Sequence, residues 1–600
     1  MKKILLFLVV ILELNMAFAQ SKNILALPEN QAPEDRICFA LYTVHDNILK
    51  LTAQFYPIKD YEPFSSLLQI KNGDIWETLQ ESDIEYPGYT SHFRIEHWDD
   101  TKQKNYRIVH NNKAFYEGTI QKNPNAKDEI VMAAFSCLSI YKRHGGQEPA
   151  KDIIDNLKKL KPDVLFFAGD QVYNHSEHYK NWIKFGESFG ELISNTPTIT
   201  IPDDHDVGQG NLWGNGGKKI SSRDGDQGGY YMPVNYIKEV ERTQTSHLPD
   251  PYDPTPIEQG IGVYYTNLTW GGISFAIIED RKFKSGPKRV LEKKHYKDTR
   301  EMDVDGATLL GERQLDFLED WTTNWKDADM KAVLSQTIFT NLATHTPTID
   351  KKQRYSTDAN GWPQSGRNKA LKVIRKSFSC MIAGDQHLGS VVHHGVEDWN
   401  NAGFSFAVPA TSNFWMRWWN PDAPGKNRMK GAPDYTGEFK DAFHNKITVH
   451  AVANPTHKDN KPREDLLKGR AAGYGIIKFN KPNRQITFEC WERNVDMFAP
   501  NSRPYTGWPV TCNQEDNFLI KNGYELPTLK LSKSNQVVTV RDRYTKDVIH
   551  SIRIKGNTYK PKVMYSGIYT VEVGEGEAMQ SLYDLEAKTK NKDIISVEIL

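Results

Sequence analysis

Side chains that bind metal ions or transfer protons stand at the ends of several apolar runs in this sequence. The run 164–168 is apolar throughout and leads into Asp170 and, three residues later, Tyr173. Other runs end in the same classes of side chain: Cys137 after 130–135, Asp203, Asp204, His205 and Asp206 after 198–202, and Asp385 and His387 after 378–384. Carboxylate, imidazole and thiolate groups are the usual protein ligands of metal ions. The pattern therefore favours a metal centre.

The order of these runs predicts that their ends lie together. Strand-like runs alternate with helical patterns such as 152–160, where apolar residues recur every three or four positions. Such an alternation predicts an α/β fold, in which ligands bind at the carboxyl ends of the strands. Several carboxylates converging at one edge repel one another unless cations neutralise them. We therefore expect more than one metal ion at this edge.

A pair of metal ions about 3.5–4 Å apart is the usual clamp for in-line attack at phosphorus. We expect Asp170 to bridge two ions and His205 to protonate the leaving oxygen. A neighbouring carboxylate, Asp204 or Asp206, would orient the His205 ring and raise its pKa. A plainer alternative makes Asp170 the N-cap of the next helix, Tyr173 a packed aromatic residue and Cys137 a small buried hydrophobe.

Four short motifs, taken in order, resemble the PhoD-like (alkaline phosphatase D) family of the calcineurin-like metallophosphoesterase superfamily. They are Phe135-Ser136-Cys137, Gly169-Asp170-Gln171-Val172-Tyr173, Asp203-Asp204-His205-Asp206 and Gly384-Asp385-Gln386-His387. In the wider superfamily the first motif is Asp-x-His, the third Asn-His-Asp/Glu and the last His-x-His. Cys137, Asp204 and Asp385 depart from those patterns, and these departures mark the PhoD-like branch.

The resemblance covers about 130–420 and implies a site that holds ferric iron and calcium, with other divalent metals as alternatives. It implies His205 as the acid and the following metal ligands: Cys137, Asp170, Tyr173, Asp204, Asp385 and His387. The resemblance also implies a metallophosphoesterase-type layered α/β core with an N-terminal β-sandwich. A loop histidine, His345, follows another strand end and is either a further ligand or a satisfied loop residue.

The 600 residues are too many for one core, and the sequence divides into four parts. Residues 1–19 read as a signal peptide, with Lys2 and Lys3, an apolar stretch and Ala17-Phe18-Ala19 as the cleavage site. We expect a β-sandwich at 20–127, the catalytic α/β domain at 128–525 and a small β module at 526–600. The mature protein is expected in the periplasm or secreted, without a membrane span.

Composition narrows the function further. The net charge is zero, so no nucleic-acid surface is indicated. The 14 Trp and 27 Tyr suit either a large core or stacking on sugars. We expect a metal-dependent phosphoesterase that acts on small-molecule or polysaccharide-linked phosphomonoesters or phosphodiesters. The alternatives are an esterase for sulfated or phosphorylated polysaccharide and a carbohydrate-binding surface protein on a phosphatase-like fold.

Three further features are open from the sequence. Five cysteines leave at least one unpaired in a monomer, and Cys490 and Cys512 are candidates for a disulfide. The glycine-rich stretch 208–229 suits a flexible lid or substrate wall, or a mobile surface insertion. The aromatic run 404–419 suits a binding loop or a corner of the core.

Overall fold

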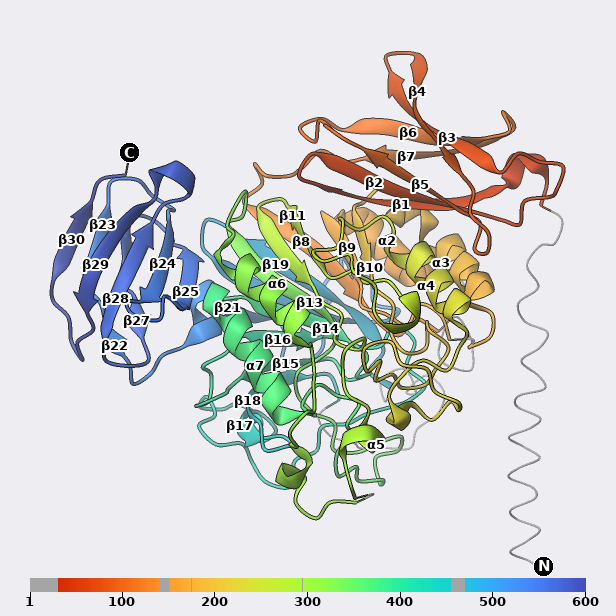
Figure 1. Ribbon diagram of the computed structural model, residues 1–600. Helices are drawn as coiled ribbons and strands as arrows, with labels where there is room; N and C mark the ends of the chain where they lie inside the picture. The colour runs from red at the N-terminus through yellow and green to blue at the C-terminus, as the bar shows by residue number, and fades with distance from the viewer. Residues whose placement is uncertain (1–30, 140–149, 174, 294, 455–469, 600) are drawn as a thin grey trace, which may run out of the picture.

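A computed structural model describes residues 31–139, 150–173, 175–293, 295–454 and 470–599 (Figure 1). The predicted signal peptide, residues 1–19, lies outside the described residues. Within the described part of the chain, no helix combines the length and apolar character needed to cross a membrane.

The centre of the molecule is built from two mixed β-sheets. The first has six strands in the order β10 (Thr198–Thr200), β9 (Val164–Phe167), β8 (Glu129–Phe135), β19 (Gly473–Asn480), β20 (Gln485–Glu492) and β21 (Val510–Asn513). The second has eight, in the order β11 (Thr266–Trp270), β12 (Ile273–Ile277), β13 (Met330–Thr337), β14 (Cys380–Gly384), β16 (Phe404–Ala407), β15 (Ser390–His394), β18 (Lys446–Val452) and β17 (Gly437–Lys440). Strands β8, β9 and β10 are parallel, as are β12, β13, β14 and β16.

The two sheets pack face to face, and helices cover their outer faces. Ring contacts such as Phe275–Phe479 and Phe406–Phe488 join the sheets across the interior. Alternate residues of β8 point the other way, so Ala133 packs with helices on the outside. These helices are α2 (Lys151–Leu160) and α3 (His178–Ile193) on one sheet, and α6 (Glu312–Thr323) and α7 (Gln364–Ile374) on the other. Burial on both faces explains the apolar runs of central strands such as β9. The α/β prediction is therefore confirmed for the core.

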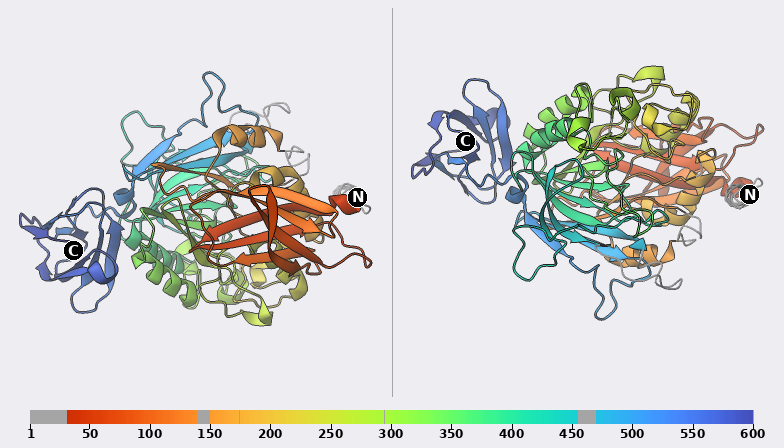
Figure 2. Two further views of the ribbon diagram at one scale, coloured as in Figure 1. Left: turned by 90° about the horizontal axis from the view of Figure 1, so that it is seen from above. Right: turned by 90° about the horizontal axis from the view of Figure 1, so that it is seen from below.

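Residues 37–120 form two antiparallel sheets that lie across one end of the core (Figures 1 and 2). One holds β1 (Ile37–His45), β2 (Ile48–Phe55) and β5 (Thr90–Ile95). The other holds β4 (Ile75–Asp83), β3 (Ser65–Asn72), β6 (Lys104–His110) and β7 (Ala114–Ile120). The main hydrophobic cluster runs without a break from β1 and β2 into the central strands.

The C-terminal residues form a separate group of short sheets beside the core (Figure 2). The largest sheet holds β25 (Val548–Arg553), β24 (Val537–Asp542), β28 (Ile568–Val573) and β29 (Gln580–Glu586). The smaller ones hold β26 (Thr558–Tyr559), β23 (Thr528–Leu531), β30 (Ile594–Val597), β22 (Tyr524–Glu525) and β27 (Lys562–Val563). Trp325 and Phe378 of the core join their hydrophobic cluster. Arg553 donates to the carbonyl oxygens of Ala328 at 2.6 Å and Trp325 at 2.9 Å. The division into domains stays a prediction.

Two of the open features take a definite form. All five cysteines are free thiols, and Cys512 lies opposite Ile486 in β20, four residues away from Cys490. The glycine-rich stretch 208–229 is packed, because its glycines allow close backbone approach. A Cβ on Gly228 would lie 2.7 Å from the Cα of Gly286, and one on Gly214 would lie 2.4 Å from the carbonyl oxygen of Lys282. Short helices α4 (Val234–Thr245) and α5 (Pro287–Val290) flank this stretch.

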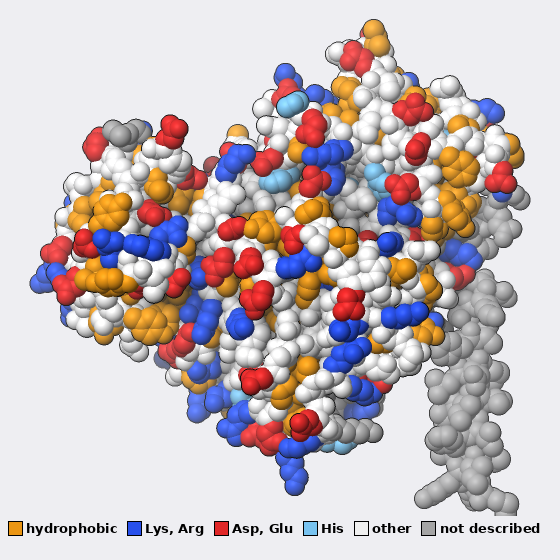
Figure 3. All heavy atoms as spheres, viewed as in Figure 1, with side chains coloured by type: hydrophobic (Ala, Val, Ile, Leu, Met, Phe, Trp, Pro, Cys, Tyr) orange, Lys and Arg blue, Asp and Glu red, His pale blue; other side chains and the backbone are white. Residues whose placement is uncertain are grey.

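Charged side chains of both signs are intermixed over the face drawn in Figure 3. This mixture follows from equal numbers of basic and acidic residues, 76 of each.

The packing of β1 on α3 depends on a glycine, Gly186, whose lack of a side chain leaves room for Phe39. A Cβ on Gly186 would lie 1.9 Å from Cδ1 of Phe39, whereas one on Gly190, a helical turn later, would lie 3.5 Å from Cβ of Phe39. We predict that Gly186→Ala destabilises the fold by about 1–3 kcal/mol through overpacking. Gly190→Ala should be neutral or stabilising by up to about 1 kcal/mol, because alanine favours the helix.

Thermal unfolding of the two variants checks this prediction. A lower midpoint for Gly186→Ala than for Gly190→Ala is expected. Equal midpoints would show that the Phe39 contact does not hold β1 against α3.

Candidate metal centre

The four motifs converge where parallel strands of both sheets end. β8, β9 and β10 contribute from the six-stranded sheet, and β14 contributes from the eight-stranded sheet. Ser136 joins the two sheets, because its Oγ accepts a hydrogen bond from the backbone N–H of Asp385 at 2.8 Å. Among the described residues, three groups of side chains have ligand atoms within 4.8 Å of one another: Cys137, Asp170 and His387; Asp170, Asp204 and His205; Asp203, Asp204 and Asp385.

The backbone turns sharply at these strand ends. Cys137, Asp170, Asp385 and His387 all adopt the left-handed region, with φ between 53° and 61°. Such angles are uncommon for residues with a Cβ and tend to mark functional sites. Gly169 stands at φ 104°, and a Cβ there would lie 2.4 Å from the Cβ of Asp203. A glycine is therefore required for the second and third motifs to approach each other.

Asp170 lies at the centre of the cluster. Its Oδ2 accepts the hydroxyl of Tyr173 at 2.9 Å and lies 3.6 Å from Sγ of Cys137, while its Oδ1 accepts the backbone N–H of His205 at 3.2 Å. Burial, and then the charge of Asp204, raise the pKa of Asp170 well above its usual range. Burial, and then the charge of Asp170, also raise the pKa values of Cys137 and Tyr173. A cation would reverse all three shifts, so these side chains fit a metal ion.

His387 has one ring nitrogen available for a metal ion. Its Nδ1 lies 3.0 Å from Oδ1 of Asn413 and 3.0 Å from the carbonyl oxygen of Trp415. A carbonyl oxygen only accepts, so Nδ1 carries the proton and Nε2 keeps its lone pair. Burial lowers the pKa of His387 to about 3, which keeps the ring neutral. A metal-binding histidine usually donates its other ring N–H to an acceptor such as a backbone carbonyl oxygen.

Asp204 shows the same fit to a cation. Its Oδ1 is buried without a hydrogen-bond partner among the described residues. Burial raises the pKa of Asp204 to about 6. Together with Asp203 and Asp385 it forms a group made of carboxylates alone. Oxygen-only groups suit hard cations such as calcium.

Arg281 is a central residue that was missed from the sequence. Its guanidinium contacts three carboxylates: Asp203 at 2.7 Å, Asp358 at 2.6 Å and Asp385 at 2.9 Å. The side chain is 2% exposed. In the sequence, Arg281 is visible only as a basic residue just past the apolar run 273–277. Arginine does not bind metal ions, so it was not among the candidate ligands.

Asp206 has a different role from the one expected. Its Oδ2 accepts hydrogen bonds from the backbone N–H groups of Asp170 at 2.6 Å and Asp203 at 2.8 Å. Its Oδ1 accepts one from the backbone N–H of Val172 and one from the side-chain amide of Gln244, both at 2.9 Å. Both oxygens are thus engaged in tying the second and third motifs together. No hydrogen bond joins Asp206 to the His205 ring among those described, so Asp206 positions backbone rather than the ring.

The ring of His205 is paired with another histidine. Its Nδ1 lies 2.7 Å from Nε2 of His175, and its Nε2 lies 4.0 Å from Oδ2 of Asp204. Burial lowers the pKa of His205 to about 4, opposite to the expected rise. The reason is that desolvation disfavours the charged ring more than the nearby carboxylates favour it.

The aromatic run 404–419 is partly core and partly surface. Trp418 and Trp419 are buried, whereas Trp415 is 45% exposed. Phe414 packs edge-on against Tyr173 and also meets the His387 ring, with centroid separations of 5.2 and 5.9 Å. His345 belongs to none of the three ligand groups among the described residues.

Comparisons with known proteins bear on the family and the fold. The family model described as PhoD-like phosphatase matches residues 181–417, which contain the third and fourth motifs. A solved structure of PhoD is 13% identical, covers 82% of this chain and 92% of its own, and superposes with a TM-score of 0.56. At that identity the likeness shows a shared fold.

Other comparisons add little. A β-glycosidase from Bacteroides vulgatus is 9% identical with a TM-score of 0.19, covers 92% of this chain and 79% of its own, and carries no structural argument. No curated protein matches the chain. The family match and the shared fold therefore confirm the resemblance to the PhoD-like phosphatase family, and they support a phosphoesterase.

Proposed function

We propose that the chain is an exported phosphoesterase with a multinuclear metal site. The observation that carries this proposal is that Asp170 groups with Cys137 and His387 on one side and with Asp204 on the other, and that Asp204 also groups with Asp203 and Asp385. A carboxylate shared in this way suits a bridge between two ions. Export rests on residues 1–19, which lie outside the described residues. The ligands are Cys137, Asp170, Tyr173, Asp204, Asp385 and His387, with Asp203 beside them.

The two kinds of ligand group favour two kinds of metal. Cys137 and Tyr173 supply a thiolate and a phenolate, which select a transition metal of strong Lewis acidity. Asp203, Asp204 and Asp385 supply oxygen atoms, which suit calcium or another hard divalent ion. Ferric iron and calcium, as implied by the family resemblance, fit these groups. When bound, such ions polarise the phosphoryl oxygens and make water a better nucleophile at neutral pH.

His205 suits the role of the acid that protonates the leaving oxygen. A neutral imidazole donates one proton, and the bond from His175 Nε2 to His205 Nδ1 decides which nitrogen carries it. When His175 donates this bond, Nε2 of His205 keeps its proton and faces the Asp204 side of the centre. His175 is then a positioning residue for the acid.

Arg417 and the exposed Trp415 suit contact with the substrate. Nε and Nη1 of Arg417 are buried without hydrogen-bond partners among the described residues, while Nη2 lies 3.4 Å from Oδ2 of Asp358. Unpaired guanidinium donors beside the centre suit the oxygens of a phosphate ester. The exposed ring of Trp415 suits contact with the organic part of the ester.

A substrate screen tests the reaction class. Purified mature protein is incubated with an aryl phosphate, a bis-aryl phosphate and an aryl sulfate. Hydrolysis of at least one phosphate ester is expected, with loss of activity on chelation and recovery when metal is restored. Hydrolysis of the sulfate alone would favour a sulfatase acting on polysaccharide. Activity on none of the three would favour a carbohydrate-binding protein.

The first prediction from the proposed function concerns Asp170. Asp170→Asn keeps the shape of the side chain but removes the charge that bridges two ions. We predict a loss of phosphoesterase activity of several orders of magnitude and a lower metal content, with the fold retained. Asp305→Asn, at an exposed position remote from the motifs, is the matched control and should change neither. Near-normal turnover of Asp170→Asn would contradict a bridged metal pair.

The second prediction concerns His205 and His175. Esters with poor leaving groups need protonation of the leaving oxygen, whereas nitrophenyl esters need little. We predict that His205→Asn slows alkyl phosphate hydrolysis more than nitrophenyl phosphate hydrolysis. His175→Ala should show the same bias to a smaller degree. Comparing kcat/KM for the two esters provides the measurement, and equal losses would point to substrate binding instead.

A further inference from the structure

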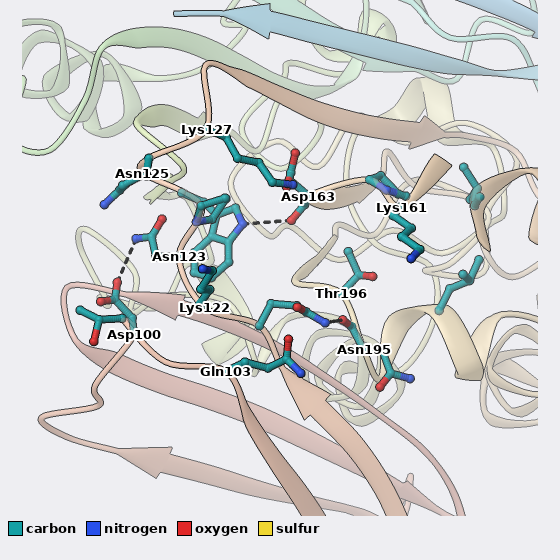
Figure 4. A pocket seen from close by; sticks show the side chains of 18 of the residues that line it. Asp100, Gln103, Lys122, Asn123, Asn125, Lys127, Lys161, Asp163, Asn195 and Thr196 are labelled. Atoms are coloured by element: carbon teal, nitrogen blue, oxygen red, sulfur yellow. Dashed lines mark hydrogen bonds and ion pairs between the residues drawn. The ribbon is translucent and has the colours of Figure 1, made fainter. Parts of the chain in front are cut away.

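A large cleft lies between the N-terminal sheets and the core (Figure 4). Its volume is about 870 Å³, within the range of ligand pockets, which occur preferentially where structural units meet. Asp163 and Thr196 line it, and they precede β9 and β10. The candidate metal centre follows the same strands at their other ends. The four residues of β9 alone span about 13 Å, so the two sites are distinct.

Lysine side chains surround this cleft. Lys127 pairs with Asp163 at 2.5 Å, and Lys158 pairs with Glu191 at 2.7 Å. Lys122 and Lys161 also line the cleft, and the side chain of neither forms an ion pair or hydrogen bond among the described residues. Figure 4 shows Lys122 and Lys161 reaching into the hollow from different segments. Two free cations in one cleft suit an anionic ligand.

The backbone at Lys161 adopts a conformation in which glycine is more usual than lysine. Lys161 ends α2 in the left-handed conformation, at φ 52° and ψ 64°. Glycine is the usual residue there, because a Cβ is disfavoured. A lysine near a helix C-terminus gains from the helix dipole, but Lys158 and Lys159 already supply that charge inside the last turn. Lys161 thus accepts a strained backbone and places its ammonium group at the cleft.

The remaining lining suits hydroxyl groups. Gln103, Asn125 and Thr196 are polar, and their side chains form no hydrogen bond in the part of the chain that is described. Asp100 accepts a hydrogen bond from Asn123 at 2.9 Å and retains acceptor capacity. A hydroxyl group both donates and accepts, so a mixture of amides, a carboxylate and ammonium groups matches a polyol that also carries anions.

The cleft continues into a second cavity. This cavity, of about 260 Å³, shares Asp100, Asn123 and Asn125 with the cleft. A third, of about 220 Å³, shares His45 and Asp46 with the second. The three cavities form a row under the N-terminal sheets, which suits an extended ligand rather than a single sugar.

We propose that the cleft binds an anionic oligosaccharide, with Lys122 and Lys161 contacting its phosphate or sulfate groups. The site is separate from the metal centre. It would hold a charged glycan chain on the protein, whatever reaction the metal centre performs.

Calorimetric titration of the full mature chain tests the proposal. The probes are sulfated dextran, phosphorylated dextran, unmodified dextran of the same length and inorganic phosphate. The test variant is Lys122→Gln with Lys161→Gln. The matched control is Lys113→Gln with Lys555→Gln, which removes the same charge at exposed positions outside the three cavities. Unchanged melting temperatures establish that both variants fold.

We expect the wild-type chain and the control to bind a charged dextran, and the test variant to bind it about tenfold or more weakly. Unmodified dextran should bind more weakly than the charged one, and added salt should weaken binding by screening. The stronger of the two charged dextrans identifies the anion as sulfate or phosphate. Equal losses in test and control variants, no loss in either, no binding by the wild type, or equally tight binding of inorganic phosphate would each overturn the proposal.

Discussion

The guanidinium of Arg281 holds together three carboxylates from three separate segments of the chain. Asp203, Asp358 and Asp385 all lie within 3.0 Å of its nitrogens, and the whole arrangement is buried. Buried charges are tolerated when they are paired and fully hydrogen-bonded. The ends of β10 and β14 can therefore meet only because a cation from the end of β12 lies between them. Removing either partner would leave an uncompensated charge inside the protein.

This compensation is incomplete, and the excess charge explains the rest of the site. Asp170, Asp204 and Asp206 are also buried, and burial raises the pKa of each, to about 6 for Asp204 and about 7 for Asp206. Backbone N–H groups satisfy Asp206, whereas Asp204 retains a buried oxygen without a described partner. Carboxylates this close remain ionised together when further cations are present. Metal ions are the cations that this set of oxygen, sulfur and nitrogen ligands fits.

The sequence allowed the strand ends to be predicted because each is a local pattern. An apolar run followed by a turn and a polar side chain identifies Cys137, Asp170 and Asp385 without knowledge of the fold. Arg281 and Asp358 could not be found this way, since their partners lie 77 or 78 residues away along the chain. The role of Asp206 was predicted wrongly because closeness in sequence did not mean contact in the fold. It neighbours His205 in sequence, but its side chain turns toward the backbone of the second motif, and His175 takes its place beside the ring.

Cys137 and Tyr173 would distinguish the proposed centre from a plain calcium site, so they provide the most direct test. A phenol with a free pKa of about 10 ionises at neutral pH only on a strong Lewis acid such as ferric iron. Iron bound to a phenolate or thiolate absorbs visible light. Elemental analysis and a visible spectrum of the protein as isolated should show iron and a coloured band. The band should be lost or moved in Tyr173→Phe and altered in Cys137→Ser. A colourless, fully active enzyme without iron would contradict the account.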